Sequence, residues 1–204
     1  MNIAIIGSGN VGGALAQQWI KAGHIVLIGS KFPLSEKNIN LANEVGEDKF
    51  TSVENAVKQS EVILIATPPN VIFEVIEQMG IVSDKILIDA TNSIAKSPEP
   101  YKTVYHCLVD KTSADVVKCF NNTGYENILN PVYKGEGVDM FMAGDSDIAK
   151  DLVVQLALDC GFENCYDFGK SDKVELLEKF ALSWINLAVM QGQGRNMAFR
   201  LVKR

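Results

Sequence analysis

The residues of this 204-residue chain best suited to chemistry form a glycine loop near its start, Gly7-Ser8-Gly9-Asn10-Val11-Gly12. The loop has the spacing GxGxxG and separates an apolar run at residues 2–6 from a helical pattern at residues 11–21. In this setting the glycines allow a tight turn, a close approach to a pyrophosphate and close helix packing, and the helix N-terminus attracts the anion. We therefore expect these six residues to bind a dinucleotide. The alternative interpretation is a tight turn without a ligand.

The second candidate position is the end of the next strand, where Ser30 and Lys31 stand. An NAD site usually places a carboxylate there to hold the ribose hydroxyls, and this chain has none at that point. A hydroxyl followed by a cation suits a 2′-phosphate, so the pair predicts NADP(H) as the cofactor. Alternatively, Lys31 is only a solvated loop residue.

Three further loops follow apolar runs of the kind that form buried strands. Ligands of parallel α/β sheets bind beyond the carboxyl ends of the strands, so these loops are expected to border the nicotinamide half of the cofactor. The amide of Asn121 could bind the carboxamide or an acceptor ring, or it could cap a helix or turn. The residues concerned are Ala66, Thr67, Pro68, Pro69, Ala90, Thr91, Asn92 and Asn121.

The same loops offer no Lys, Tyr or His as an evident general acid, and the sequence names no catalytic residue. His24 falls at the amino end of a predicted strand, and His106 falls in a predicted surface helix over residues 101–109, so both are expected to be structural. The four cysteines form no CxxC pair and have no His at metal-ligand spacing, which favours reduced, mostly buried thiols over a metal site.

These loops need strands and helices to position them, and the chain alternates the two in β-α-β order. This order predicts an α/β fold, a Rossmann-type doubly wound and mostly parallel sheet with a short C-terminal helical tail. We expect a dinucleotide-binding domain over residues 1–169 and a helical tail over residues 170–204. The expected strands are at residues 2–6, 25–28, 49–51, 62–66, 85–89, 116–120, 140–143 and 165–168. The expected helices are at residues 11–21, 35–45, 53–59, 70–79 and 147–160, with helix only from residue 171 onward.

Composition narrows the class of protein. The chain is 47% hydrophobic with a net charge of -6, which is typical of a folded domain and unsuited to clamping nucleic acid. No apolar run approaches the roughly 20 residues that a membrane span requires, and the N-terminus lacks the features of a signal peptide. We expect a cytoplasmic protein with no membrane or nucleic-acid partner.

Taken together, the glycine loop, the Gly-Ser-Lys strand end and the stretch Lys118-Cys119-Phe120-Asn121-Asn122 resemble the NADP oxidoreductases that depend on the deazaflavin coenzyme F420. The chain also resembles the cytosolic domain of the six-transmembrane ferric reductases. The resemblance implies that Ser8, Asn10 and Val11 line the cofactor and that a deazaflavin stacks over the nicotinamide near Asn121. The chain departs from that family at Phe32, where a second cation is usual, and at Asn121, where the family has a histidine.

The predicted function is hydride transfer between NADP(H) and a deazaflavin or flavin-like acceptor, a small-molecule substrate. The alternatives are an imine reductase of the pyrroline-5-carboxylate type and a non-catalytic NADP-binding sensor or regulatory subunit. Apolar residues at helical spacing over residues 176–198 predict a homodimer through the C-terminal helices. They could instead be a lid on the chain's own core.

Overall fold

An eight-stranded sheet forms the centre of the computed structural model, which describes residues 1–33 and 35–204. Its strands lie in the order β10-β9-β6-β5-β4-β1-β2-β3. All neighbouring strands are parallel except β6 and β9, which are antiparallel, so the mostly parallel sheet is confirmed. The strands are β1 Asn2–Ile6, β2 Ile25–Gly29, β3 Phe50–Thr51, β4 Val62–Ile65, β5 Ile86–Asp89, β6 Asp115–Lys118, β9 Asp139–Gly144 and β10 Asn164–Asp167.

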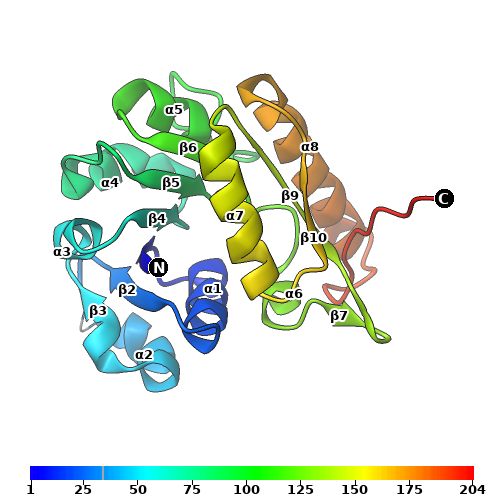
Figure 1. Cartoon of the computed structure of the whole chain (residues 1–204), viewed down its shortest axis with the longest axis horizontal. Coiled ribbons are helices and arrows are strands. Elements are labelled where there is room, and N and C mark those ends of the chain that lie inside the picture. The colour runs from blue at the N-terminus through cyan, green and yellow to red at the C-terminus, as the bar shows by residue number, and fades with distance from the viewer. Residues whose placement is uncertain (34) are drawn as a thin grey trace.

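Helices cover both faces of this sheet, which makes the fold doubly wound (Figure 1). Ile3 and Ile5 of β1 pack into the core beneath α1 and α7, whereas Ala4 and Ile6 pack into the core beneath α3, α4, α5 and α8. Both faces of β1 are therefore buried, which explains its continuous apolar run. The helices are α1 Asn10–Lys21, α2 Ile39–Val45, α3 Val53–Lys58, α4 Ile72–Met79, α5 Val104–Lys111, α6 Tyr125–Leu129, α7 Asp147–Asp159 and α8 Val174–Ile185. The Rossmann-type α/β prediction is confirmed.

Three local expectations need correction. The helix expected at residues 35–45 begins as a 3-10 turn, Glu36–Asn38, and becomes α-helical only at Ile39, because the Asn38 amide turns inward to the carbonyls of Phe32 and Pro33. The strand expected at residues 116–120 ends at Lys118, and Phe120 takes a left-handed φ of 62°. The short helix α6 and the hairpin of β7 Val132–Tyr133 and β8 Glu136–Gly137 were not predicted.

The C-terminal tail is helical only in part. Helix α8 continues into a π-helical turn, Asn186–Met190, and no helix follows it in the described residues. Gly192 and Gly194 take left-handed φ values of 69° and 85°, which end the helix. The expectation of helical spacing through residue 198 is therefore wrong.

The residues after Gly194 instead form an extended segment that is hydrogen-bonded to the rest of the domain. The Asn127 amide donates to the carbonyl oxygen of Met197 at 2.8 Å, and the backbone N–H of Asp139 donates to the carbonyl oxygen of Phe199 at 3.3 Å. The rings of Phe180 and Phe199 lie 4.6 Å apart between centroids. In Figure 1 this segment leaves the domain beside α8, at the opposite end of the molecule from β3.

Candidate functional site

A cleft of about 530 Å³ opens beyond the carboxyl ends of β1, β2, β4 and β5. It lies where the strand order reverses between β1 and β4, the position at which open α/β sheets bind their ligands. Residues from both sides of that reversal border it. They are Ile6, Gly7, Ser8, Gly9, Asn10, Val11, Gly29, Ser30, Lys31, Val53, Ala66, Thr67, Pro68, Val71, Glu74, Val75, Gln78, Ala90, Thr91 and Asn92.

The three glycines of the loop have separate geometric roles. Gly7 has a φ of +119°, and a Cβ there would lie 2.5 Å from the carbonyl oxygen of Ala66. A Cβ on Gly12 would lie 2.0 Å from the carbonyl oxygen of Gly7, so only glycine lets α1 start this close to β1. A Cβ on Gly9 would meet nothing within 4 Å. Gly9 thus faces open space, which is the arrangement that a closely approaching pyrophosphate needs.

The N-terminus of α1 is free to bind an anion. Gly9 is the N-cap and no side chain caps the helix, whose first backbone hydrogen bond runs from the Gly13 N–H to the Gly9 carbonyl at 2.7 Å. The preceding N–H groups have no helical partner, and the helix dipole adds positive potential at this end. The loop can therefore hold a phosphate group without a basic side chain.

Ser30 and Lys31, at the carboxyl end of β2, border one end of the cleft. The Ser30 hydroxyl accepts from the Phe32 N–H at 3.3 Å, and the Asn38 amide lies 3.5 Å from it. Lys31 Nζ pairs with Glu74 Oε1 of α4 at 2.5 Å. The sequence reasoning missed Glu74, because a carboxylate in the helix after β4 comes close to Lys31 only in the folded chain.

At the other end, two buried hydroxyl oxygens have no hydrogen-bond partner among the described residues, Thr67 Oγ1 and Thr91 Oγ1. Both residues border the cleft. Unpartnered buried polar atoms are unusual in a folded protein and indicate a missing partner. Their hydroxyls fit the carboxamide and ribose of a nicotinamide nucleotide, so the residues present suit NADP(H) at both ends of the cleft.

Asn121 is hydrogen-bonded to Asn92 and is not among the residues that line the cleft. Its Nδ2 donates to Asn92 Oδ1 at 3.1 Å, and Asn92 Nδ2 donates to the Asn121 carbonyl at 3.2 Å. This reciprocal pair fixes the side chain of Asn92, which does border the cleft. Of the sixteen residues predicted for the site, Gly12, Pro69 and Asn121 are not among the lining residues.

Several lining residues were not predicted. Most are apolar side chains or glycines that shape the pocket and carry no motif, and Glu74 and Gln78 are the polar ones. They are Ile6, Gly29, Val53, Val71, Glu74, Val75 and Gln78.

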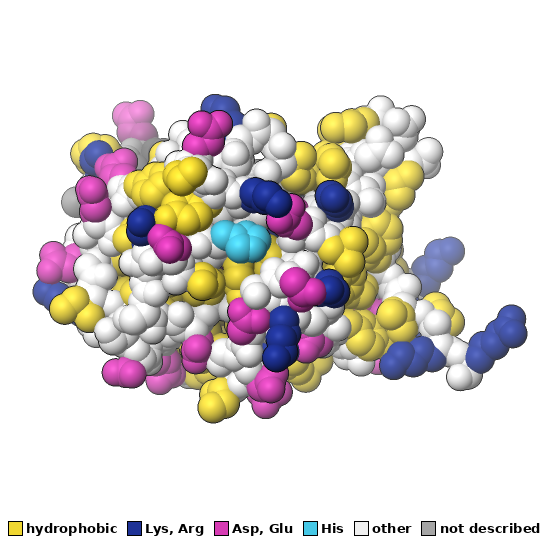
Figure 2. Space-filling model, turned by 90° about the horizontal axis from the view of Figure 1, so that it is seen from above, with side chains coloured by type: hydrophobic (Ala, Val, Ile, Leu, Met, Phe, Trp, Pro, Cys, Tyr) yellow, Lys and Arg dark blue, Asp and Glu magenta, His cyan; other side chains and the backbone are white. Residues whose placement is uncertain are grey.

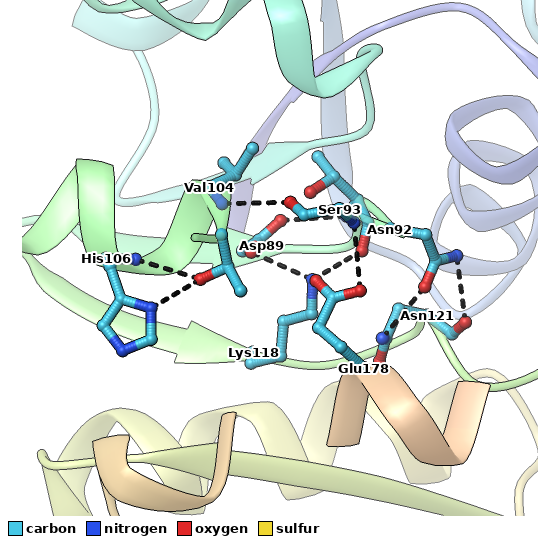
Figure 3. Close-up of polar contacts among 10 residues, drawn as sticks. Asp89, Asn92, Ser93, Val104, His106, Lys118, Asn121 and Glu178 are labelled. Atoms are coloured by element: carbon cyan, nitrogen blue, oxygen red, sulfur yellow. Dashed lines mark hydrogen bonds and ion pairs between the residues drawn. The ribbon is translucent and has the colours of Figure 1, made fainter. Parts of the chain in front are cut away.

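A buried ionic cluster lies under the loop that follows β5 (Figure 3). Lys118 Nζ, fully buried at the end of β6, lies 3.0 Å from Asp89 Oδ2 and 2.7 Å from Glu178 Oε1. Burial opposes the charge on Lys118, but the Asp89 and Glu178 carboxylates outweigh it and raise the pKa of the amine. Burial also raises the pKa of Glu178, against the opposing effect of Lys118. The sequence signal was available, since Lys118 interrupts the apolar run at residues 116–120.

The two histidines lie outside the cleft. His24 Nε2 lies 2.9 Å from Asp159 Oδ2, and His106 Nδ1 lies 2.7 Å from the hydroxyl of Thr103, which caps α5. The cysteines are free thiols, of which Cys107, Cys119 and Cys160 are buried.

The described residues contain no group of three or more His, Cys, Asp or Glu side chains arranged to hold a metal ion. Within residues 1–33 and 35–204, no helix combines the length and the apolar character that a membrane span requires.

The fold is of the Rossmann type, and the cleft lies where the sheets of such folds bind dinucleotides. Residues 2–93 match the family model described as NADP oxidoreductase, coenzyme F420-dependent, which confirms the resemblance drawn from the sequence. The match covers less than half of the chain, and both the model and the Arthrobacter structure reported below are described as NADP oxidoreductases or reductases.

Three relatives illustrate the range of similar proteins. A candidate F420-dependent NADP reductase from Arthrobacter sp. FB24 has a TM-score of 0.86 and 22% identity, with all of both chains covered. A reductive aminase from Aspergillus terreus in complex with NADPH has a TM-score of 0.65 and 16% identity over 94% of this chain and 61% of that one. Human pyrroline-5-carboxylate reductase 2 is 25% identical over 171 residues, 79% of this chain and 49% of that protein. The chain thus spans about half the length of the curated relatives it matches.

Proposed function

We propose that this chain binds NADP(H) in the cleft and transfers hydride between it and a deazaflavin or flavin-like acceptor. The observation that carries the proposal is the chemistry of the nicotinamide end. The described residues that line the cleft from the β4 and β5 loops are Ala66, Thr67, Pro68, Ala90, Thr91 and Asn92. They offer hydroxyls and an amide and no titratable side chain.

This lining favours an acceptor that needs no protein acid. Reduction of a carbonyl requires a proton donor for the developing alkoxide, whereas a conjugated ring can spread the incoming charge over its heterocycle. The Lys118 amine contacts the Thr91 carbonyl of the β5 loop, but it is fully buried and already engaged by Asp89 and Glu178. It therefore presents no proton to the cleft.

The chain's own residues would hold and orient the nucleotide. The loop around Gly9 and the N-terminus of α1 would bind the pyrophosphate, and Ser30 and Lys31 would bind the 2′-phosphate. The hydroxyls of Thr67 and Thr91 would orient the nicotinamide. When bound, NADPH supplies the hydride, and catalysis then depends on orientation and contact distance more than on acid–base groups.

Similarity is divided between this acceptor class and the imine alternative. The Arthrobacter structure covers this chain from end to end, and its described cofactor is F420. Pyrroline-5-carboxylate reductase 2 is matched over only 49% of its length. That relative nevertheless keeps an imine reductase as the second candidate function.

The proposal is tested by following NADPH oxidation at 340 nm with the pure protein and a panel of acceptors. We expect turnover with a deazaflavin or a flavin and little with cyclic imines. Rapid reduction of imines or ketones, with no response to deazaflavin, FMN or FAD, would show that the acceptor assignment is wrong. Tight NADPH binding with no turnover on any acceptor would favour the alternative function, a non-catalytic NADP-binding sensor or regulatory subunit.

A further inference from the structure

The backbone of the loop that follows β5 is anchored from beneath at Thr91 and Ser93. The Thr91 N–H donates to Asp89 Oδ1 at 2.9 Å, and the Thr91 carbonyl accepts from Lys118 Nζ. The Ser93 N–H donates to Glu178 Oε2 at 3.0 Å. Three elements, β5, β6 and α8, thus fix the backbone of this loop through Asp89, Lys118 and Glu178 (Figure 3). The side chains of Thr91 and Asn92 in the loop border the cleft.

Lys118 lies at the centre of this cluster of contacts. Its amine contacts both carboxylates and the Thr91 carbonyl, and its side chain is 0% exposed. A buried ionic cluster contributes little net stability compared with apolar packing, because desolvation offsets the attraction between the charges. What the cluster does impose is a defined geometry on the groups that it contacts.

We propose that Lys118 is a positioning residue for the nicotinamide half of the dinucleotide, acting through the carbonyl of Thr91. This inference rests on the proposed function. Lys118 touches no ligand itself. It holds the loop so that the unpartnered Thr91 hydroxyl and the Asn92 amide meet the nicotinamide end. Because Glu178 belongs to α8, the C-terminal tail takes part in shaping the site.

The test compares NADPH with adenosine 2′,5′-bisphosphate, which carries the adenosine end and lacks the nicotinamide half. In Lys118→Met we expect NADPH binding to weaken by about tenfold or more and kcat to fall on the order of 10- to 100-fold, since small displacements of positioning groups have effects of this size. Binding of the bisphosphate should stay within about twofold. Unchanged bisphosphate binding also reports that the adenosine end remains folded.

Lys150 provides a matched control. It too lies between two carboxylates, with Nζ 3.0 Å from Asp147 and 2.8 Å from Asp167, and its side chain is 9% exposed. It belongs to α7 and does not line the cleft. Lys150→Met should lower the melting temperature while leaving the affinities for both nucleotides unchanged. A loss of NADPH affinity in both lysine variants would indicate a general effect on folding and would overturn the inference.

Removing the cation alone leaves two buried carboxylates unpaired, so a second variant is needed in case Lys118→Met does not fold. Asp89→Asn, Lys118→Met and Glu178→Gln together remove all the charges and keep similar shapes. The same selective loss of NADPH affinity is expected in it. Equal affinities of variant and wild type for NADPH, or equal losses for both nucleotides, would refute the positioning role. A wild-type protein that binds neither nucleotide would refute the proposed function instead.

Discussion

Lys31 Nζ lies 2.5 Å from Glu74 Oε1 at the adenosine end of the cleft. The cation that the sequence predicts for a 2′-phosphate is therefore shared with a carboxylate from α4. Both side chains are exposed, by 60% and 47%, so the pair adds little stability and can open at small cost. An incoming phosphate would compete with Glu74 for Lys31.

Lys31→Ala should weaken NADPH binding by about tenfold or more, because a charge-assisted contact to phosphate contributes roughly 1.5–3 kcal/mol. NADH binding should barely change. Equilibrium fluorescence titration with both nucleotides measures this. Lys58→Ala, which removes another exposed lysine paired with a glutamate, is the control. Equal losses of affinity for NADPH and NADH would show that Lys31 does not bind the 2′-phosphate.

Glu74→Gln should strengthen NADPH binding by roughly two- to fivefold, the scale of one exposed ion pair. The substitution frees Lys31 and removes the repulsion between a carboxylate and the 2′-phosphate, so NADH affinity should stay nearly constant. The ratio of the two dissociation constants is the measurement, with Glu54→Gln as the control. Weaker NADPH binding in Glu74→Gln would contradict this competition.

The glycine loop allows a paired prediction. Gly9→Ala should keep the wild-type melting temperature and lose nucleotide affinity, because its Cβ meets no protein atom and would occupy the approach of the pyrophosphate. Gly12→Ala should destabilise the fold by about 1–3 kcal/mol or more, because its Cβ would overlap the Gly7 carbonyl. Calorimetry and NADPH titration separate the two effects. A Gly9→Ala variant with normal affinity would place the pyrophosphate elsewhere.

Asn121→Ala should raise the KM for the acceptor or lower kcat while NADPH binding stays nearly normal. The substitution removes the donor to Asn92 Oδ1 but keeps the backbone carbonyl that accepts from Asn92 Nδ2, so we expect Asn92 to keep its place beside the cofactor. Steady-state kinetics with a deazaflavin or flavin, beside a binding titration, measures both quantities. A large loss of NADPH affinity with unaltered acceptor kinetics would assign Asn121 to the cofactor instead.

The protein is predicted to form a homodimer through its C-terminal tail. Leu176, Leu187, Val189 and Met190 are exposed, and Figure 2 shows apolar side chains gathered at the end of the molecule that carries the tail. Light scattering at micromolar concentration should give twice the chain mass. Val189→Asp and Met190→Asp together should shift the protein toward monomer, with the exposed Ile81→Asp as a control far from the tail. A wild-type monomer would contradict this interface.

The Rossmann fold and the glycine loop of the candidate site could be predicted from the amino-acid sequence alone. Buried parallel strands need apolar residues on both faces, so β1 and β4 can be recognised in the sequence as continuous apolar runs. The requirements at Gly7 and Gly12 are steric and local, and only glycine satisfies them. The glycine loop can therefore also be recognised in the sequence. The helix at residue 174 was also predictable, because its apolar face repeats at helical spacing.

Which charged groups lie next to one another could be learned only from the folded chain. Glu74 reaches Lys31 across 43 positions of the chain, and Glu178 reaches Ser93 across 85. No local pattern encodes such distances, because they follow from strand order and helix placement. The same reason explains the end of the tail, where apolar residues that could have formed a helix lie extended. Gly192 and Gly194 turn the backbone, and Asn127 and Asp139 bind its carbonyls and amides instead.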